Sequence, residues 1–163
     1  MSRFHFLILL VLWLAGGPAR AEWQVVNGDN GTSARIINAN GHELKIYRDA
    51  SDAIYARLQL ADGLYSLRPD ACPTYQVDQR EPRNTSINTT GCIIEPNSVE
   101  FILGYIEAGR VVSLPLHEFM NGSEIHYRFA LASGGYQATK FSLSGSLRTL
   151  RTVLGQDLEI LPR

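Results

Sequence analysis

The chain has 163 residues, of which 45% are hydrophobic and 19% are charged, and its formal net charge is −1 at pH 7. This length is that of one globular domain with a hydrophobic core of its own. The slightly acidic balance argues against a nucleic-acid-binding protein, because such a protein needs a basic surface to displace the counterions around the phosphates.

The N-terminus is predicted to be a secretory signal peptide, residues 1–21. Arg3 supplies a positive charge, residues 6–14 form an apolar run, and residues 16–18 (Gly-Gly-Pro) end it. Small residues then stand at the −3 and −1 positions of a cleavage site, at Ala19 and Ala21. The run is too short for a membrane-spanning helix, which needs ~20 apolar residues. We therefore expect cleavage after Ala21, a periplasmic or secreted location, and a mature chain that is not an integral membrane protein.

Residues 22–163 are predicted to form a single β-rich domain. Turn dipeptides recur along them at Asn27-Gly28, Asn30-Gly31, Asn40-Gly41, Asp62-Gly63, Asn121-Gly122 and Gly134-Gly135. The segments between the turns alternate apolar and polar residues, as strands with one buried face do. Strands are predicted at 23–26, 33–38, 42–48, 53–60, 74–78, 111–116, 125–131 and 137–143.

Two segments change to a helical period. In 98–108, apolar residues recur at helical spacing and Gly109 follows as a C-terminal residue. A strand at 99–103 is the alternative, since Gly104 and the β-branched residues weaken a helix. In 145–154, leucines share one helical face. The predicted fold class is mainly β: a small antiparallel β-sandwich or partly closed barrel with one or two short helices, at about 98–108 and 145–154.

The chain contains two cysteines, Cys72 and Cys92. In an exported protein they are expected to form one disulfide that closes the loop 72–92. Closing a loop of about 20 residues should stabilise the fold by ~3 kcal/mol. Neither cysteine has a partner at metal-ligand spacing, and there is no C-x-x-C pattern, so the disulfide is predicted to be structural.

Within this loop, Tyr75, Arg80 and Arg83 are the candidate partner-binding residues. Loops on a rigid scaffold often carry function, and Tyr and Arg are enriched at binding hot spots. The alternative is that the loop is a solvent-exposed crossover without a binding role.

The histidines suggest one weak metal-site candidate. If Asn121-Gly122 is the centre of a two-residue hairpin, His117 lies directly opposite His126. Two imidazoles about 5 Å apart at Cβ can share a metal ion or form a pH-sensitive pair. No third ligand is evident in the sequence, so no metal site is predicted beyond this pair.

The sequence shows no G-x-S-x-G, H-E-x-x-H, P-loop, G-x-G-x-x-G or EF-hand pattern. We therefore expect no enzymatic activity and no cofactor.

The second half of the chain resembles the invasion-associated locus B family of exported bacterial proteins. The matching segments are Y-Q-V-D-Q-R-E-P (75–82), Gly91-Cys92, Ala108-Gly109-Arg110, and F-S-L-S-G-S-L-R-T-L (141–150). The resemblance implies an exported protein, periplasmic or associated with the outer membrane, and some members are linked to host-cell invasion or stress tolerance. It brings no catalytic residues.

These features together predict an exported, non-enzymatic binding or accessory protein that acts in envelope stress or host interaction. Its partner is expected to be a protein or an envelope component of unknown identity. The alternative is an inhibitor of a cell-envelope enzyme such as lysozyme, a class that is also small, exported and disulfide-linked.

Overall fold

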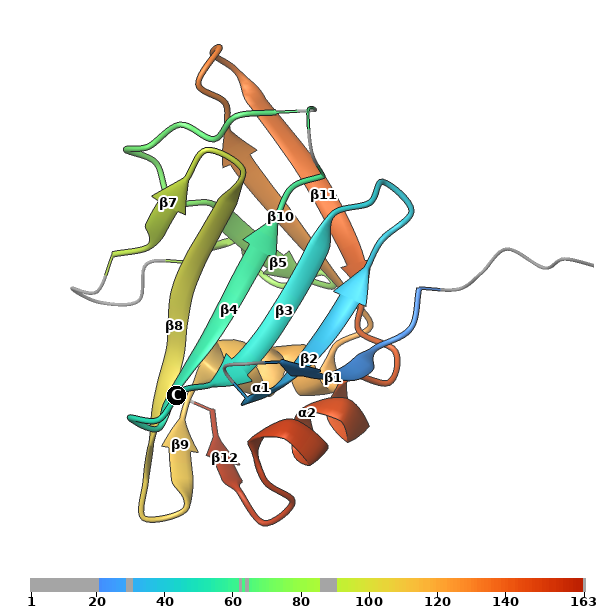
Figure 1. Ribbon diagram of the computed structural model, residues 1–163, viewed down its shortest axis with the longest axis vertical. Helices are drawn as coiled ribbons and strands as arrows, with labels where there is room; N and C mark the ends of the chain where they lie inside the picture. Colours follow the sequence, from blue (N-terminus) through green and yellow to red (C-terminus); the bar gives the residue numbers. More distant parts are fainter. Residues whose placement is uncertain (1–20, 29–30, 62, 64, 86–90, 163) are drawn as a thin grey trace, which may run out of the picture.

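The computed structural model describes residues 21–28, 31–61, 63, 65–85 and 91–162 (Figure 1). The predicted signal peptide, apart from its last residue, lies outside these residues. The described chain is mainly β with two helices, as the sequence predicts. No helix within it is both long and apolar enough to cross a membrane.

The larger sheet has eight strands. Seven lie in the order β1 (Gln24–Gly28), β2 (Gly31–Ile37), β3 (Glu43–Arg48), β4 (Ala53–Gln59), β8 (Ser98–Glu107), β9 (Arg110–Val112) and β12 (Glu159–Leu161), and β7 (Ile93–Glu95) also pairs with β8. All of these pairs are antiparallel except β9 with β12, which is parallel. The strands predicted in the first half of the chain are confirmed by β1 to β4.

The smaller sheet has four strands and lies behind the larger one in Figure 1. Its order is β11 (Tyr136–Ser142), β10 (Glu124–Ala130), β5 (Thr74–Val77) and β6 (Arg83–Asn84). The chain passes between the sheets through helix α1 (Leu114–Asn121), which follows β9, and returns through α2 (Ser146–Leu154), which follows β11. Both helices lie in the lower half of the molecule in this view, and they contact each other.

The core lies between the two sheets. On β3, Leu44 and Ile46 are fully buried, as their alternation predicts. Across the sandwich, the ring of Phe101 on β8 lies 6.1 Å from the ring of Tyr127 on β10. The two sheets stay separate and do not close into a barrel, so the sandwich is the correct form of the predicted fold class.

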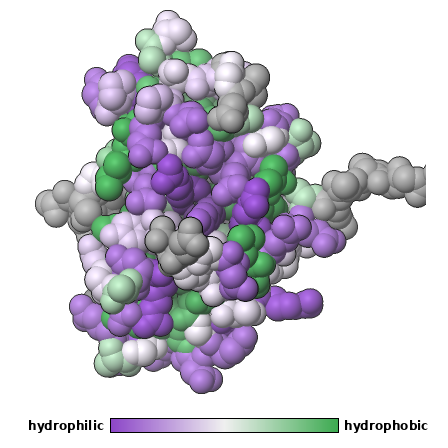
Figure 2. Space-filling model, viewed as in Figure 1, coloured by the Kyte–Doolittle hydropathy of each residue, from purple (hydrophilic) through white to green (hydrophobic). Residues whose placement is uncertain are grey.

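The outward face of the larger sheet is polar. Lys45, Arg57 and Glu100 are neighbours across β3, β4 and β8, and hydrophilic side chains cover much of this face in Figure 2. Two of its polar side chains contact carboxylates. The hydroxyl of Tyr47 donates a hydrogen bond to Glu100 at 2.5 Å, and Arg57 forms an ion pair with Glu95 at 2.7 Å.

Two side chains that flank strands of the larger sheet, Trp23 before β1 and Asn38 after β2, donate hydrogen bonds to β11. Trp23 is 8% exposed, and its indole Nε1 donates to the carbonyl oxygen of Ser142 at 2.9 Å. The amide of Asn38 donates to the carbonyl oxygen of Lys140, also at 2.9 Å. These two bonds satisfy edge carbonyls that would otherwise face solvent and join the two sheets at one side.

The predicted helix at 98–108 is wrong, because this segment is strand β8. Its buried residues include Val99, Phe101 and Leu103, at a period of two. Ala108 and Gly109 have φ values of 49° and 75° and form the two-residue turn of the β8–β9 hairpin. A hairpin turn and a helix C-terminus both favour a residue in the left-handed conformation. Gly109 therefore did not distinguish a strand followed by a hairpin turn from a helix.

The strand predicted at 111–116 is confirmed only for Val111 and Val112, which lie in β9. The hairpin predicted at Asn121-Gly122 is wrong, because α1 occupies the rest of this region. Ser113 caps the helix by accepting a hydrogen bond from the N–H of Leu116 at 3.1 Å, and Pro115 fits the first turn. Gly122 ends it with an ordinary φ of −87°. The packing explains this glycine, since a Cβ here would lie 2.3 Å from a methyl group of Val77. The helix predicted at 145–154 is confirmed as α2.

Candidate functional site

The disulfide between Cys72 and Cys92 is confirmed, with the two Cα atoms 5.9 Å apart. Cys72 lies just before β5 in the smaller sheet, and Cys92 just before β7 in the larger sheet. The bond therefore joins the two sheets as well as closing a loop. The closed segment is also more regular than the sequence indicates, since β5 and β6 form an antiparallel pair within it.

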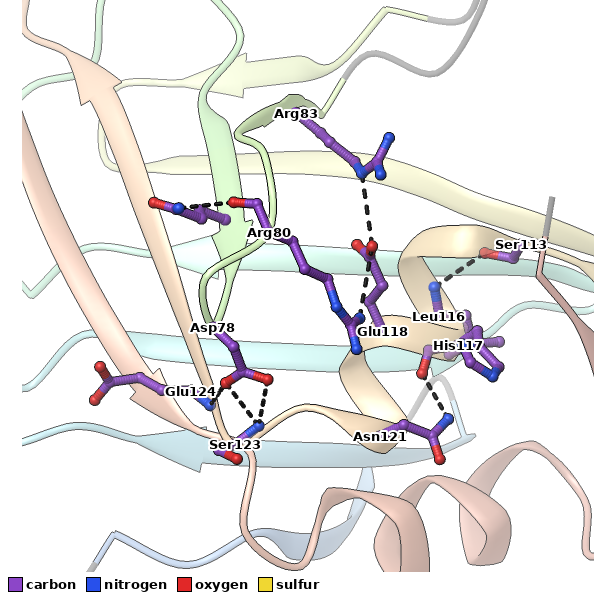
Figure 3. Close-up of polar contacts among 11 residues, drawn as sticks. Asp78, Arg80, Arg83, Ser113, Leu116, His117, Glu118, Asn121, Ser123 and Glu124 are labelled. Carbon is purple, nitrogen blue, oxygen red and sulfur yellow. Dashed lines mark hydrogen bonds and ion pairs between the residues drawn. The ribbon is translucent and has the colours of Figure 1, made fainter.

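The most unusual polar group near this segment is the carboxylate of Glu118 on α1. The residue is only 2% exposed, yet two arginines of the disulfide-closed segment approach it. Arg80 Nη1 and Arg83 Nε each lie 3.6 Å from the same oxygen, Glu118 Oε1. Figure 3 shows both arginines reaching from the segment toward the helix. We call these three residues the Arg–Glu cluster.

Hydrogen bonds fix the backbone that carries the arginines. Asp78 has φ 53°, and its carboxylate accepts hydrogen bonds from the backbone N–H groups of Ser123 and Glu124, each at 3.0 Å to Oδ1 (Figure 3). Gln76 donates its side-chain amide to the carbonyl oxygen of Arg80 at 2.7 Å. The turn after β5 is therefore attached to the start of β10, and the arginines emerge from a defined backbone.

The charges of the Arg–Glu cluster do not cancel. One carboxylate faces two guanidinium groups, which leaves one surplus positive charge. The arginine side chains are 39% and 42% exposed, so water screens the attraction, whereas the carboxylate is desolvated. A buried carboxylate without a partner would be costly. Glu118 therefore holds two guanidinium groups near each other at the surface, and they in turn compensate its burial.

Tyr75, predicted as part of a contact surface, is instead a core residue. It is 2% exposed, and its ring packs edge-on against Phe119 at 5.7 Å. Burial, together with the negative charge of Glu118, raises the pKa of the Tyr75 phenol well above its ordinary value. Its hydroxyl lies near that carboxylate but has no partner with hydrogen-bond geometry in the described part of the chain. The alternation in β5 already places Tyr75 on the face of Val77, which is also buried.

Sequence reasoning missed Glu118. The residue lay between an expected strand and an expected hairpin, so nothing marked it as buried. The signals that could have found it are Ser113 and Pro115, which together are typical of a helix start.

The predicted pairing of His117 with His126 is wrong. His117 lies on α1, and His126 on β10 is opposite Gln76 and Lys140. His126 Nε2 lies 2.6 Å from an oxygen of Glu124. Among the residues that the structure describes, no group of three or more His, Cys, Asp or Glu side chains could hold a metal ion.

Comparison with known proteins gives one informative match. The crystal structure of invasion associated protein B from Bartonella henselae aligns with a TM-score of 0.53, over 83% of this chain and 93% of that chain. The two proteins share a fold. They are 13% identical, so the similarity concerns the fold alone. No family model matches the sequence, and neither does any curated protein. The resemblance noted in the sequence is thus confirmed as a resemblance of fold.

Proposed function

We propose that this protein is an exported, non-enzymatic accessory protein that binds an acidic group of a protein or envelope component through Arg80 and Arg83. The fold similarity to invasion associated protein B supports the general class. The observation that carries the proposal is the Arg–Glu cluster, in which a buried carboxylate gathers two half-exposed guanidinium groups.

The chemistry of the cluster favours an anionic partner. Guanidinium groups bind carboxylates and phosphates through parallel N–H donors. Each arginine approaches Glu118 only to 3.6 Å, which is longer than a hydrogen bond, and the pair has a surplus positive charge. Because the backbone around both arginines is hydrogen-bonded, binding a partner would cost little conformational entropy at these two residues. These properties are those of an arginine hot spot on a preformed surface.

The export part of the proposal rests on the sequence and the disulfide. Residues 1–21 have the pattern of a signal peptide. A single structural disulfide is typical of proteins that fold in an oxidising compartment. The periplasm or the exterior of the cell is therefore the proposed location. The absence of common catalytic motifs in the sequence supports a role in binding.

Affinity capture tests the binding proposal. The tagged protein is used under oxidising conditions to capture partners from an envelope extract, in parallel with the double variant Arg80→Ala/Arg83→Ala. The matched control is Arg48→Ala/Arg57→Ala, which removes the same charge from side chains of similar exposure on the larger sheet, 39% and 38%.

The expected result is a partner captured by the wild type and by the control but lost from the double variant. A partner retained by the double variant, with both variants folded as judged by circular dichroism, would show that the arginines are not the binding surface. A captured lysozyme that the protein inhibits in solution would replace the accessory role with that of an inhibitor.

A further inference from the structure

A second surface feature lies beside the two helices, and α1, which carries Glu118 of the Arg–Glu cluster, also borders it. A groove of about 220 Å³ opens between α1, α2 and β12. Its lining residues are His117, Met120, Asn121, Leu147, Arg151 and Ile160. We refer to it as the helix groove.

The lining combines apolar side chains with one guanidinium group. Met120, Leu147 and Ile160 supply apolar surface from all three elements. Leu147 is 47% exposed, although it is a large apolar side chain next to a concave surface. No aspartate or glutamate belongs to the residues that line the groove in the described chain.

Arg151 brings a positive charge that forms no ion pair with a carboxylate of the described residues. Its Nη1 donates to the backbone carbonyl oxygens of Gln156 and Leu158, at 3.2 Å and 2.5 Å. These bonds fix the side chain against the loop that follows α2. A guanidinium group held in place without a carboxylate is suited to receive one from a ligand.

From this charge complementarity we infer that the helix groove binds a small linear carboxylate, a free medium-chain fatty acid. The carboxylate lies at Arg151, and the alkyl chain lies against Leu147, Met120 and Ile160. At ~30 Å³ for each water-sized group, the groove accommodates about seven such groups. Hexanoate and octanoate therefore match its size, with the end of the longer chain at the open side.

Titration of the purified protein with butanoate, hexanoate, octanoate and decanoate, followed by amide NMR shifts, tests the inference. The affinity should rise about fourfold for each methylene group that is buried and level off near octanoate. A dissociation constant on the order of 0.1–1 mM is expected for hexanoate. Hexylammonium, with the same chain and the opposite charge, should bind at least tenfold more weakly.

Three variants locate the site. Arg151→Gln should weaken hexanoate binding at least tenfold, and Leu147→Gln should weaken octanoate binding about fourfold or more. Arg148→Gln is the matched control, because it removes the same charge from an exposed position of α2 that does not line the groove, and it should leave both affinities unchanged. Leu147 is exposed, so its variant remains folded even if Arg151→Gln does not.

Several results would overturn the inference. No saturation by any carboxylate below 10 mM, roughly tenfold above the expected range, would exclude the site. Equal losses for Arg151→Gln and Arg148→Gln would show nonspecific attraction to a basic surface. Leu147→Gln could also shift a monomer–dimer equilibrium in sedimentation without changing the affinity for octanoate. This result would show that a second copy of the chain covers the groove.

Discussion

Removing the disulfide by the double substitution Cys72→Ala/Cys92→Ala should lower the free energy of unfolding by about 3 kcal/mol. The bond closes a segment with a sequence separation of 20, and a loop of this length loses about that much chain entropy when it is cross-linked in the unfolded state. For a domain of this size, each kcal/mol corresponds to roughly 2–4 °C in melting temperature. The melting temperature should therefore fall by roughly 6–12 °C.

Urea unfolding followed by far-UV circular dichroism measures this loss. The wild type treated with a reductant is the control, because it loses the same bond without any substitution. Its unfolding curve should coincide with that of the double variant. The dependence of the free energy on urea should also increase, since the unlinked chain exposes more surface when it unfolds. A loss below about 1 kcal/mol would refute the argument from chain entropy.

The position of the bond also predicts which strands respond. Because it joins the segments before β5 and β7, amide hydrogen exchange should become faster in these two strands when the bond is removed. Exchange in β3 and β4 should change only through global unfolding, since their neighbours are all within the larger sheet. A uniform increase over the whole chain would contradict a local role for the bond.

Three further variants, the first with a matched control, test individual contacts. Gly122→Ala should cost about 2–3 kcal/mol in urea unfolding because the new Cβ would lie 2.3 Å from a buried valine methyl group, whereas Gly91→Ala, with open space around it, should cost less than about 0.5 kcal/mol. Glu118→Gln should destabilise the protein by about 1–2 kcal/mol, after allowance for water at the half-exposed arginines, and a gain in stability would mean that burial of the carboxylate costs more than its partners return. Ser98→Ala should raise the pKa of Glu95 in an NMR titration, because the hydrogen bond from Ser98, with the nearby arginine charge, lowers it. A lowered carboxyl pKa contributes stability above the unfolded pKa and loses it as the pH falls through the folded pKa, so the stability lost in Ser98→Ala should be seen at neutral pH and should vanish under acidic conditions.

Several elements follow from local pattern. The alternation in β3 and β4 predicted both the strands and their buried faces, because a half-buried antiparallel strand repeats every two residues whatever its neighbours are. The leucines of α2 predicted that helix for the corresponding reason at a helical period. The two cysteines predicted their own bond, since the chain contains no others.

The segment 98–107 shows where local pattern is insufficient. Its apolar residues satisfy both a helical and a strand period, and the glycine after it suits either ending. The decision comes from pairing: β4 lies along most of β8, and β7 and β9 pair with its two ends. The backbone hydrogen bonds of three neighbouring strands outweigh a weak helical propensity.

The sequence alone determined the mainly β class, most of the strands and the disulfide, because each depends on residues that are close together in the chain or unique within it. The signal peptide at residues 1–21 stays a prediction. The tertiary structure decided which polar side chains meet. Arg80 and Arg83 reach Glu118 only because β5, β6 and α1 pack together. The helix groove likewise requires the parallel pairing of β12 with β9, strands some 50 residues apart in the chain. Contacts between distant segments depend on how whole elements pack, and no local period encodes them.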